Sequence, residues 1–291
     1  MHFTVGVFLK EGENLDKALI PYEEDALPEY LEFKSIEEEC QNEYEIGTEE
    51  RVIMPDGRLL RKWDEEFRKQ GEIGFGTNTH EVPKELEIKE FPFKELYSSF
   101  EEFMLKWYGY EGRDDVKGKY GYWHNPDAKW DWYELGGRWR GMLLVKEDAP
   151  SSIGTPGVFG DNLSAKYTPK GYKWVDMAKV KDIEWELMIK LAKEEAEKRW
   201  DKVMANTANA DGNKRTREYF LNDIRINDTK NSYVKRHSGF VTYAVLTSDG
   251  DWYEKDWGNE EKQKEWNKKY FDRFIKDADP ELFLAIVDCH I

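Results

Sequence analysis

The side chains that could bind or catalyse gather in one stretch, residues 120–141, and at the last few positions of the chain. The stretch reads YGYWHNPDAKWDWYELGGRWRG and holds four of the 12 tryptophans. Aromatic rings give a large contact area at a small entropy cost, and fixed charges between them orient a ligand or partner. The candidate binding residues are Trp123, His124, Asn125, Lys129, Trp130, Asp131, Trp132, Tyr133, Arg138, Trp139, Asp288 and His290.

No established catalytic or metal-binding motif joins these residues. The sequence has no HExxH, GxSxG, P-loop or paired-cysteine zinc pattern. Cys289 and His290 would point to opposite faces of a strand, which argues against a nucleophile–base dyad. A metal site of His124, Asp288 and His290 requires two distant stretches to pack together. The simpler expectation is that Asp288 and His290 cap the last strand through local hydrogen bonds. We therefore expect no metal and no cofactor, and we favour a protein that is not an enzyme.

Three uses of the aromatic stretch stay open. Trp and Tyr rings stack on bases, and a pocket with Lys129, Asp131, Arg138 and His290 would suit a small nucleotide-like ligand. The same side-chain types dominate the binding energy of protein interfaces, so they would also suit a protein partner. The third is that most of the rings fill the core. The anchors of a protein interface would be Trp130, Trp132, Tyr133, Arg138 and Trp139.

Composition narrows the class of protein. The chain has 291 residues, enough to bury a core, and its 39% hydrophobic and 15% aromatic content argues against a disordered protein. The net charge of −16 disfavours non-specific binding to nucleic acid and suits a basic partner, although solubility alone also explains such a charge. There is no secretory leader pattern and no run of 18 apolar residues, and Cys40 and Cys289 are expected to be reduced thiols. We expect a cytoplasmic protein without a membrane span.

Hydrophobic spacing predicts the elements that position the candidate residues. Residues 2–9 and 282–287 are predicted strands, and the second delivers Asp288 and His290 to the end of the chain. Alternation in residues 129–135 would place Trp130 and Trp132 on one face of a strand, with Asp131 and Tyr133 on the other. Gly136 and Gly137 would form a tight hairpin or bulge before an extended run over 138–145. Asp131 and Arg138 would then meet across that turn.

The remaining pattern alternates helices and strands. Helices are predicted after an Asn14 cap, over 93–107 ending at Gly109, over 182–203 with Asp182 as the cap, and after Asn259. Residues 36–50 form a solvated acidic helix or surface segment, and 240–254 form a β-hairpin. The predicted fold is α+β, with a mixed, largely antiparallel sheet flanked by helices and with long inserted loops. It comprises an N-terminal region (1–147), a Gly/Pro/Ser-rich loop (148–172) and a C-terminal unit (173–291), packed as one domain.

The terminal and central motifs resemble those of a known group of proteins. HFTVGVFL with ALIPY, NPDAKWDWYELGGRWRG, KVKDIEWELM, and TYAVLTSDGDWYEK with FLAIVDCHI resemble a family of uncharacterised bacteriophage and prophage proteins. The similarity runs along the chain in order, and residues 30–90 and 205–235 carry little of it. The resemblance implies a phage-associated protein in the host cytoplasm, and phage accessory proteins of this size often look like inhibitors of host immunity, including inhibitors of the Gabija type.

The leading hypothesis is a phage-encoded accessory protein that inhibits a bacterial anti-phage defence component by protein–protein binding. The alternative is an enzyme or sequestering protein for a small nucleotide-like ligand in a pocket lined by Trp, Arg and Lys. A homo-oligomer stays open under either hypothesis.

Overall fold

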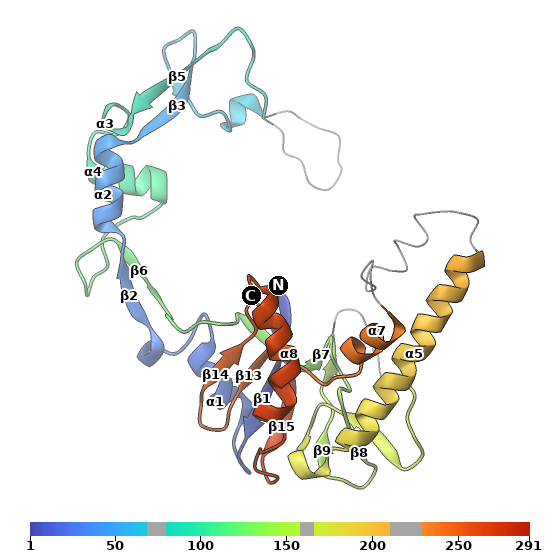
Figure 1. Ribbon diagram of the computed structural model, residues 1–291. Coiled ribbons are helices and arrows are strands. Elements are labelled where there is room, and N and C mark those ends of the chain that lie inside the picture. Colours follow the sequence, from blue (N-terminus) through green and yellow to red (C-terminus); the bar gives the residue numbers. More distant parts are fainter. Residues whose placement is uncertain (69–79, 158–165, 210–228) are drawn as a thin grey trace. The chain divides into compact units, whose positions relative to one another are not determined.

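The structure is a computed structural model that describes residues 1–68, 80–157, 166–209 and 229–291 (Figure 1). It confirms the predicted α+β class, because helices flank a mixed and mostly antiparallel sheet. The chain forms two compact units, which we call the sheet unit (residues 1–30 and 127–291) and the inserted unit (31–126). This partition differs from the expected order of 1–147, 148–172 and 173–291. The reason is strand pairing: β7, from the middle of the chain, lies in the same sheet as both chain ends.

The centre of the sheet unit is the antiparallel pair of β1 (His2–Leu9) and β15 (Phe283–His290), which align over eight residue pairs. Both strands are apolar on both faces, as strands covered on both sides require. The strand order is β10-β7-β15-β1-β13-β14, and β12 and β9 extend the sheet beside β15. The other strands are β7 (Trp132–Gly137), β9 (Ser151–Ser152), β10 (Thr155–Pro156), β12 (Met177–Lys179), β13 (Ala244–Leu246) and β14 (Trp252–Glu254).

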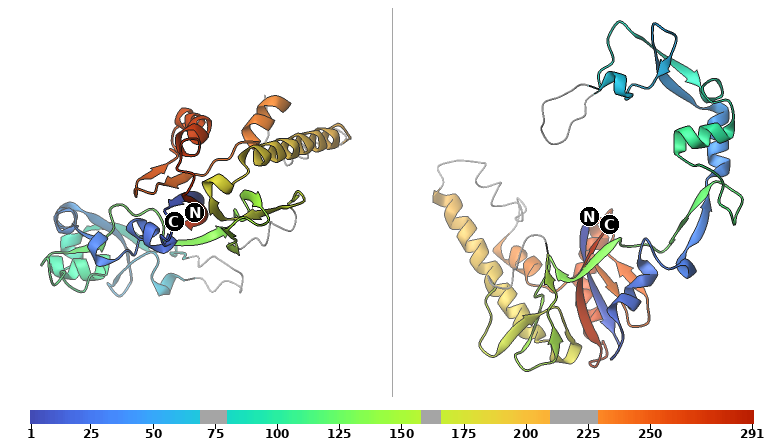
Figure 2. Two further views of the ribbon diagram at one scale, coloured as in Figure 1. Left: turned by 90° about the horizontal axis from the view of Figure 1, so that it is seen from below. Right: turned by 180° about the vertical axis from the view of Figure 1, so that it is seen from behind.

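Helices cover the two faces of this sheet (Figures 1 and 2). On one face, Phe8, Leu284 and Ile286 pack with Tyr270 and Phe274 of α8. On the other face, alternate residues of β1 and β15 pack with α1 and with Trp130. Strands from the N-terminal, central and C-terminal parts of the chain therefore share one sheet. The helices of this unit are α1 (Leu15–Leu19), α5 (Trp185–Asn209), α7 (Lys230–His237) and α8 (Glu260–Phe274), and its short 3-10 turns are η1 (Ile20–Tyr22), η2 (Pro28–Tyr30) and η5 (Val180–Asp182).

Two of the three predicted helix caps are confirmed. The Asn14 side chain accepts a hydrogen bond from the Lys17 amide, and the Asn259 side chain accepts from the amides of Glu261 and Lys262. The predicted Asp182 cap is wrong, because α5 begins three residues later. Ile183 is extended and bridges to Val145, and the Glu184 amide donates to Leu144, so this segment is tied to a strand before the helix starts.

The predicted hairpin at the diglycine is also wrong. Gly136 and Gly137 end β7, and β7 pairs with β15 and β10 instead of with the following strand. The next strand, β8 (Leu143–Lys146), pairs with β11 (Tyr172–Val175). Turn hydrogen bonds from Trp139 to Gly136 and from Arg140 to Gly137 carry the chain out of the sheet. Asp131 and Arg138 therefore do not form the expected pair across a turn.

The inserted unit has two small sheets and a helical layer. β2 (Glu32–Ser35) pairs with β6 (Gly121–His124), and we call this two-stranded sheet the ribbon. β3 (Thr48–Ile53) lies between β4 (Leu59–Leu60) and β5 (Glu87–Pro92). The acidic segment forms α2 (Glu37–Ile46), and η3 (Glu65–Phe67) is a 3-10 turn. The aromatic stripe of this unit is core as predicted, since Phe100, Phe103 and Met104 are buried.

The helix predicted over 93–107 is broken into pieces. It forms α3 (Phe93–Leu96), α4 (Phe100–Phe103) and the π-helical turn η4 (Met104–Tyr108), and Gly109 follows in the left-handed conformation as predicted. The break occurs because Tyr97 and Ser99 are extended, and the Ser99 hydroxyl accepts from the Glu102 amide to start a new helix. A serine in the middle of an apolar helical pattern competed with helix continuation.

Candidate functional site

The predicted binding residues are divided between the two units. Trp123, His124 and Asn125 lie in the inserted unit, and all the others lie in the sheet unit.

In the sheet unit, two histidine–aspartate pairs lie at the end of the central strands. His2 Nδ1 is 2.9 Å from Asp288 Oδ1, and His290 Nδ1 is 2.8 Å from Asp131 Oδ1. The β1–β15 register places His2 directly opposite His290, with ring centroids 4.8 Å apart. The hydrogen bond from the His290 imidazole lowers the pKa of the Asp131 carboxyl. We call these four residues the sheet-end cluster.

Asp288 is almost fully buried, and its partners come from far along the chain. Besides His2, it accepts a hydrogen bond from the Arg138 amide at 2.9 Å. The expectation that Asp288 and His290 cap the last strand locally is therefore wrong, since His290 binds Asp131 across the strand pair. Cys289 is also buried, and burial raises the pKa of its thiol, so it is unsuited to act as a nucleophile.

The diglycine lies between two buried carboxylates. A Cβ atom on Gly136 would be 2.6 Å from Asp176 Oδ2, and one on Gly137 would be 2.5 Å from Asp288 Cβ. Asp176 accepts hydrogen bonds from the amides of Gly141 and Gly154, and burial raises the pKa of its carboxyl. The two glycines therefore let a strand end approach these carboxylates closely, which is a structural role.

The predicted anchor rings of this unit do not form one surface. Trp130 is only 4% exposed and packs in the core against Tyr133, whose hydroxyl donates to Asp16. Trp132 is 44% exposed and lies beside the His2 ring. The predicted alternation fails because β7 begins only at Trp132, so Trp130 precedes the strand. Trp139 is partly buried against the other core cluster.

Of the positive residues proposed to bind a nucleotide, Lys129 already has an acidic neighbour: its Nζ is 3.5 Å from Glu254 Oε1. The contact of Arg138 with Asp288 is made by its backbone amide and leaves the role of its guanidinium open. Two cavities are described in the sheet unit, and neither is lined by Lys129, Asp131, Arg138 or His290.

In the inserted unit, the ribbon presents an indole that is both exposed and fixed. Trp123 is 43% exposed. Its Nε1 donates to Asp114 Oδ2 at 2.9 Å, the Lys117 ammonium lies 5.3 Å from the ring, and the Phe33 ring packs edge-on at 5.5 Å. Strand alternation puts Tyr122 and His124 on the opposite face, with ring centroids 5.7 Å apart. Asn125 is buried directly after the strand.

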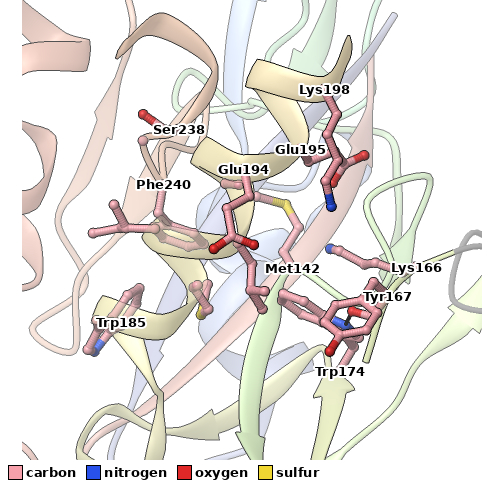
Figure 3. Close-up of a pocket in the computed structure, with 15 residues that line it drawn as sticks. Met142, Lys166, Tyr167, Trp174, Trp185, Glu194, Glu195, Lys198, Ser238 and Phe240 are labelled. Carbon is pink, nitrogen blue, oxygen red and sulfur yellow. Dashed lines mark hydrogen bonds between the residues drawn. The ribbon is translucent and has the colours of Figure 1, made fainter. Parts of the chain in front are cut away.

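A cavity of about 680 Å³ lies in the sheet unit, beside α5 (Figure 3). Its walls are mainly apolar and aromatic, with two lysines and two glutamates among them. The lining residues are Met142, Lys166, Tyr167, Trp174, Trp185, Met188, Ile189, Leu191, Ala192, Glu194, Glu195, Lys198, Ser238, Gly239 and Phe240.

Sequence reasoning missed His2 and the whole lining of this cavity. His2 had a signal, because a strand that opens with histidine and another that ends with histidine become neighbours if the chain ends pair. The cavity had no such signal in the sequence, because its lining comes from five separate segments of the chain. Part of the predicted loop, residues 158–165, lies outside the described residues.

Within the described ranges, no group of three or more His, Cys, Asp or Glu side chains is arranged to hold a metal ion. None of the helices in that part of the chain combines the length and the apolar composition that a bilayer crossing needs. Comparison with protein-family models, with curated proteins and with solved structures gives no match.

Proposed function

We propose that this protein is a phage-encoded accessory protein that inhibits a bacterial anti-phage defence component by protein–protein binding in the host cytoplasm, and that the ribbon of the inserted unit is its contact surface. The observation that carries the proposal is the Trp123 indole, which is widely exposed although three neighbours fix its orientation. These contacts order the ring and still leave much of its surface open to a partner.

Preorganisation is what gives such a ring its value in binding. Ordering a side chain at an interface costs free energy, and a ring that is already ordered avoids that cost. Tryptophan is among the residues most enriched at the energetic centres of protein interfaces. The exposed Tyr122 ring on the other face of the same strand widens the surface that a partner could contact.

Charge supports a basic partner for the inserted unit. Residues 31–126 hold 23 of the chain's 60 acidic residues and 14 of its 44 basic residues. The inserted unit therefore has a formal net charge of −9, whereas the sheet unit, with twice the number of residues, has −7. Complementary charge speeds encounter and favours the correct partner more than it adds affinity.

Co-expression with individual bacterial defence systems tests the proposal, and nuclease complexes of the Gabija type are the first to include. We expect the tagged protein to co-purify with a component of one system and to restore phage growth in cells that carry that system. Trp123→Ala should weaken binding by about 30-fold, roughly 2 kcal/mol, and reduce the rescue of phage growth.

The matched control is Trp257→Ala, which removes an even more exposed indole, 63% exposed, from the sheet unit. This variant should bind as the wild type does. The proposal is wrong if no defence component is bound and no phage growth is restored. The ribbon is the wrong surface if the two variants bind equally well.

A further inference from the structure

The cavity beside α5 has the composition of a small-molecule site. Its volume of about 680 Å³ lies within the range of about 300–1,000 Å³ that ligand pockets occupy. Trp185 and Phe240 pack edge to face at 5.1 Å and form an aromatic wall. Met188 on α5 and Met142 add unbranched apolar side chains that adapt to a ligand's outline.

Lys166 is a cationic residue of this mainly apolar lining, and most of its hydrogen-bonding capacity is not satisfied by the described residues. Its ammonium donates one hydrogen bond, to the Gly141 carbonyl at 2.6 Å, and lies 3.9 Å from the centre of the Trp174 ring. Within the described part of the chain, no carboxylate forms an ion pair with it. An ammonium has three N–H donors, so two have no protein acceptor among the described residues. Burial lowers the pKa of this amine, and the carboxylates of Glu195 and Asp176, which form no ion pair with it, offset only part of that effect.

A second lysine faces the same space. In Figure 3 the amino group of Lys198, which extends from α5, points toward that of Lys166. No carboxylate within the described ranges pairs with Lys198 either. Two ammonium groups that converge repel each other. Glu195, which also lines the cavity and acts on Lys166, offsets part of that repulsion, and an anion placed between the lysines would relieve the rest.

We propose that this cavity binds a small aromatic anion, in which one phosphate or carboxylate group contacts Lys166 and Lys198 and a planar ring packs against Trp185 and Phe240. The lining glutamates, Glu194 and Glu195, limit the ligand to a single anionic group because they would repel a second. This site lies in the sheet unit and does not depend on the protein contact proposed for the ribbon.

Calorimetric titration of the full chain tests this assignment. The probes are the four ribonucleoside monophosphates and two aromatic carboxylates, benzoate and indole-3-carboxylate, each compared with its uncharged nucleoside or amide. We expect saturable binding of at least one anion, and at least about tenfold weaker binding of its uncharged counterpart, since the charge-assisted hydrogen bonds are lost. Which head group binds better separates phosphate from carboxylate ligands.

Substitutions then locate the binding to this cavity. Lys166→Met should weaken anion binding at least about tenfold and leave the uncharged counterpart unaffected. Lys198→Met should also weaken anion binding. Because Lys198 is more exposed, its replacement is less disruptive to folding, so the test does not depend on the Lys166 variant alone. Lys193→Met, an exposed lysine of α5 that does not line the cavity, is the matched control and should bind normally. The assignment is overturned if no probe binds, or if neither cavity variant binds more weakly than the control.

Discussion

The two units of this protein bury their strands to different degrees. In the sheet unit, β1 and β15 are covered on both faces, and seven of the eight residues of β1 are buried. In the inserted unit, β5 has no buried residue, and the ribbon is open on both faces. A strand covered by helices on both sides removes far more apolar area from water than one in a two- or three-stranded sheet. The central strands of the sheet unit are thus more deeply buried than the ribbon and β5 of the inserted unit, and we expect them to be the more stable part.

Buried carboxylates also have different kinds of partner in the two units. The sheet unit buries the carboxylates of Asp176 and Asp288, which backbone amides satisfy at close range. The inserted unit buries Glu49, which forms ion pairs with Arg51 at 2.6 Å and Arg61 at 3.1 Å. The first arrangement depends on glycines that let the backbone approach, and the second depends on long side chains. The units should therefore respond to different kinds of substitution.

The largest effect is expected at Trp130, whose ring fills the core of the sheet unit. Trp130→Ala should lower the free energy of unfolding by about 3–5 kcal/mol, because it leaves a cavity that the tightly packed strands cannot close. Trp132→Ala, two residues away and 44% exposed, should cost less than about 1 kcal/mol. Chemical denaturation measures both. Similar losses for the two variants would contradict the assignment of one ring to the core and the other to the surface.

In the inserted unit, the corresponding test is Glu49→Gln. Removing this carboxylate leaves Arg51 and Arg61 without their shared anion, which should cost about 3 kcal/mol. If the units are energetically separate, amide exchange should accelerate in residues 31–126 and stay slow in β1 and β15. Equal acceleration in both units would show that they unfold together, and the units would then differ in burial alone.

The diglycine gives a smaller effect that separates close approach from backbone conformation. Gly137 and Gly57 both have positive φ, of +49° and +86°, but only Gly137 lies against another side chain. Gly57→Ala should cost about 1 kcal/mol from the backbone alone. Gly137→Ala should cost about 2–3 kcal/mol, because the new methyl group also displaces Asp288. Thermal unfolding of the two variants measures the difference, and equal shifts would remove the packing role assigned to the diglycine.

Local features of the fold could be predicted from the sequence, and pairings over long distances in the chain could not. Strands 2–9 and 282–287 and the Asn14 and Asn259 caps depend on residues within one or two turns, and the structure confirms them. The hairpin at Gly136 was wrong because a turn signal does not say which strand a segment will pair with. β7 pairs instead with β15, a buried strand about 150 residues away in the chain.

The candidate sites show the same limit. Residue type identified Trp123 and Trp132 as binding candidates, and both are exposed, but it gave the same weight to the buried Trp130. Alternation applies only within a strand, and Trp130 lies before the first residue of β7, whereas Trp132 is that first residue. The pairing of His2 with Asp288 required the register of β1 against β15, and the Lys166 cavity required the packing of segments that share no motif.

The smallest effect is expected in the sheet-end cluster, where the Asp131–His290 pair is largely exposed. Because His290 lowers the pKa of Asp131 in the folded protein, this pair stabilises the fold above the ordinary pKa of aspartate, and the stabilisation is lost as the pH falls through the lowered value. The wild type should therefore lose more stability than Asp131→Asn between about pH 5 and about pH 2. Denaturation curves of both proteins across that range measure the difference. Parallel curves would mean that solvent screens the pair completely. The sheet-end cluster would then add no more to the free energy of unfolding than the exposed ion pairs of the inserted unit do.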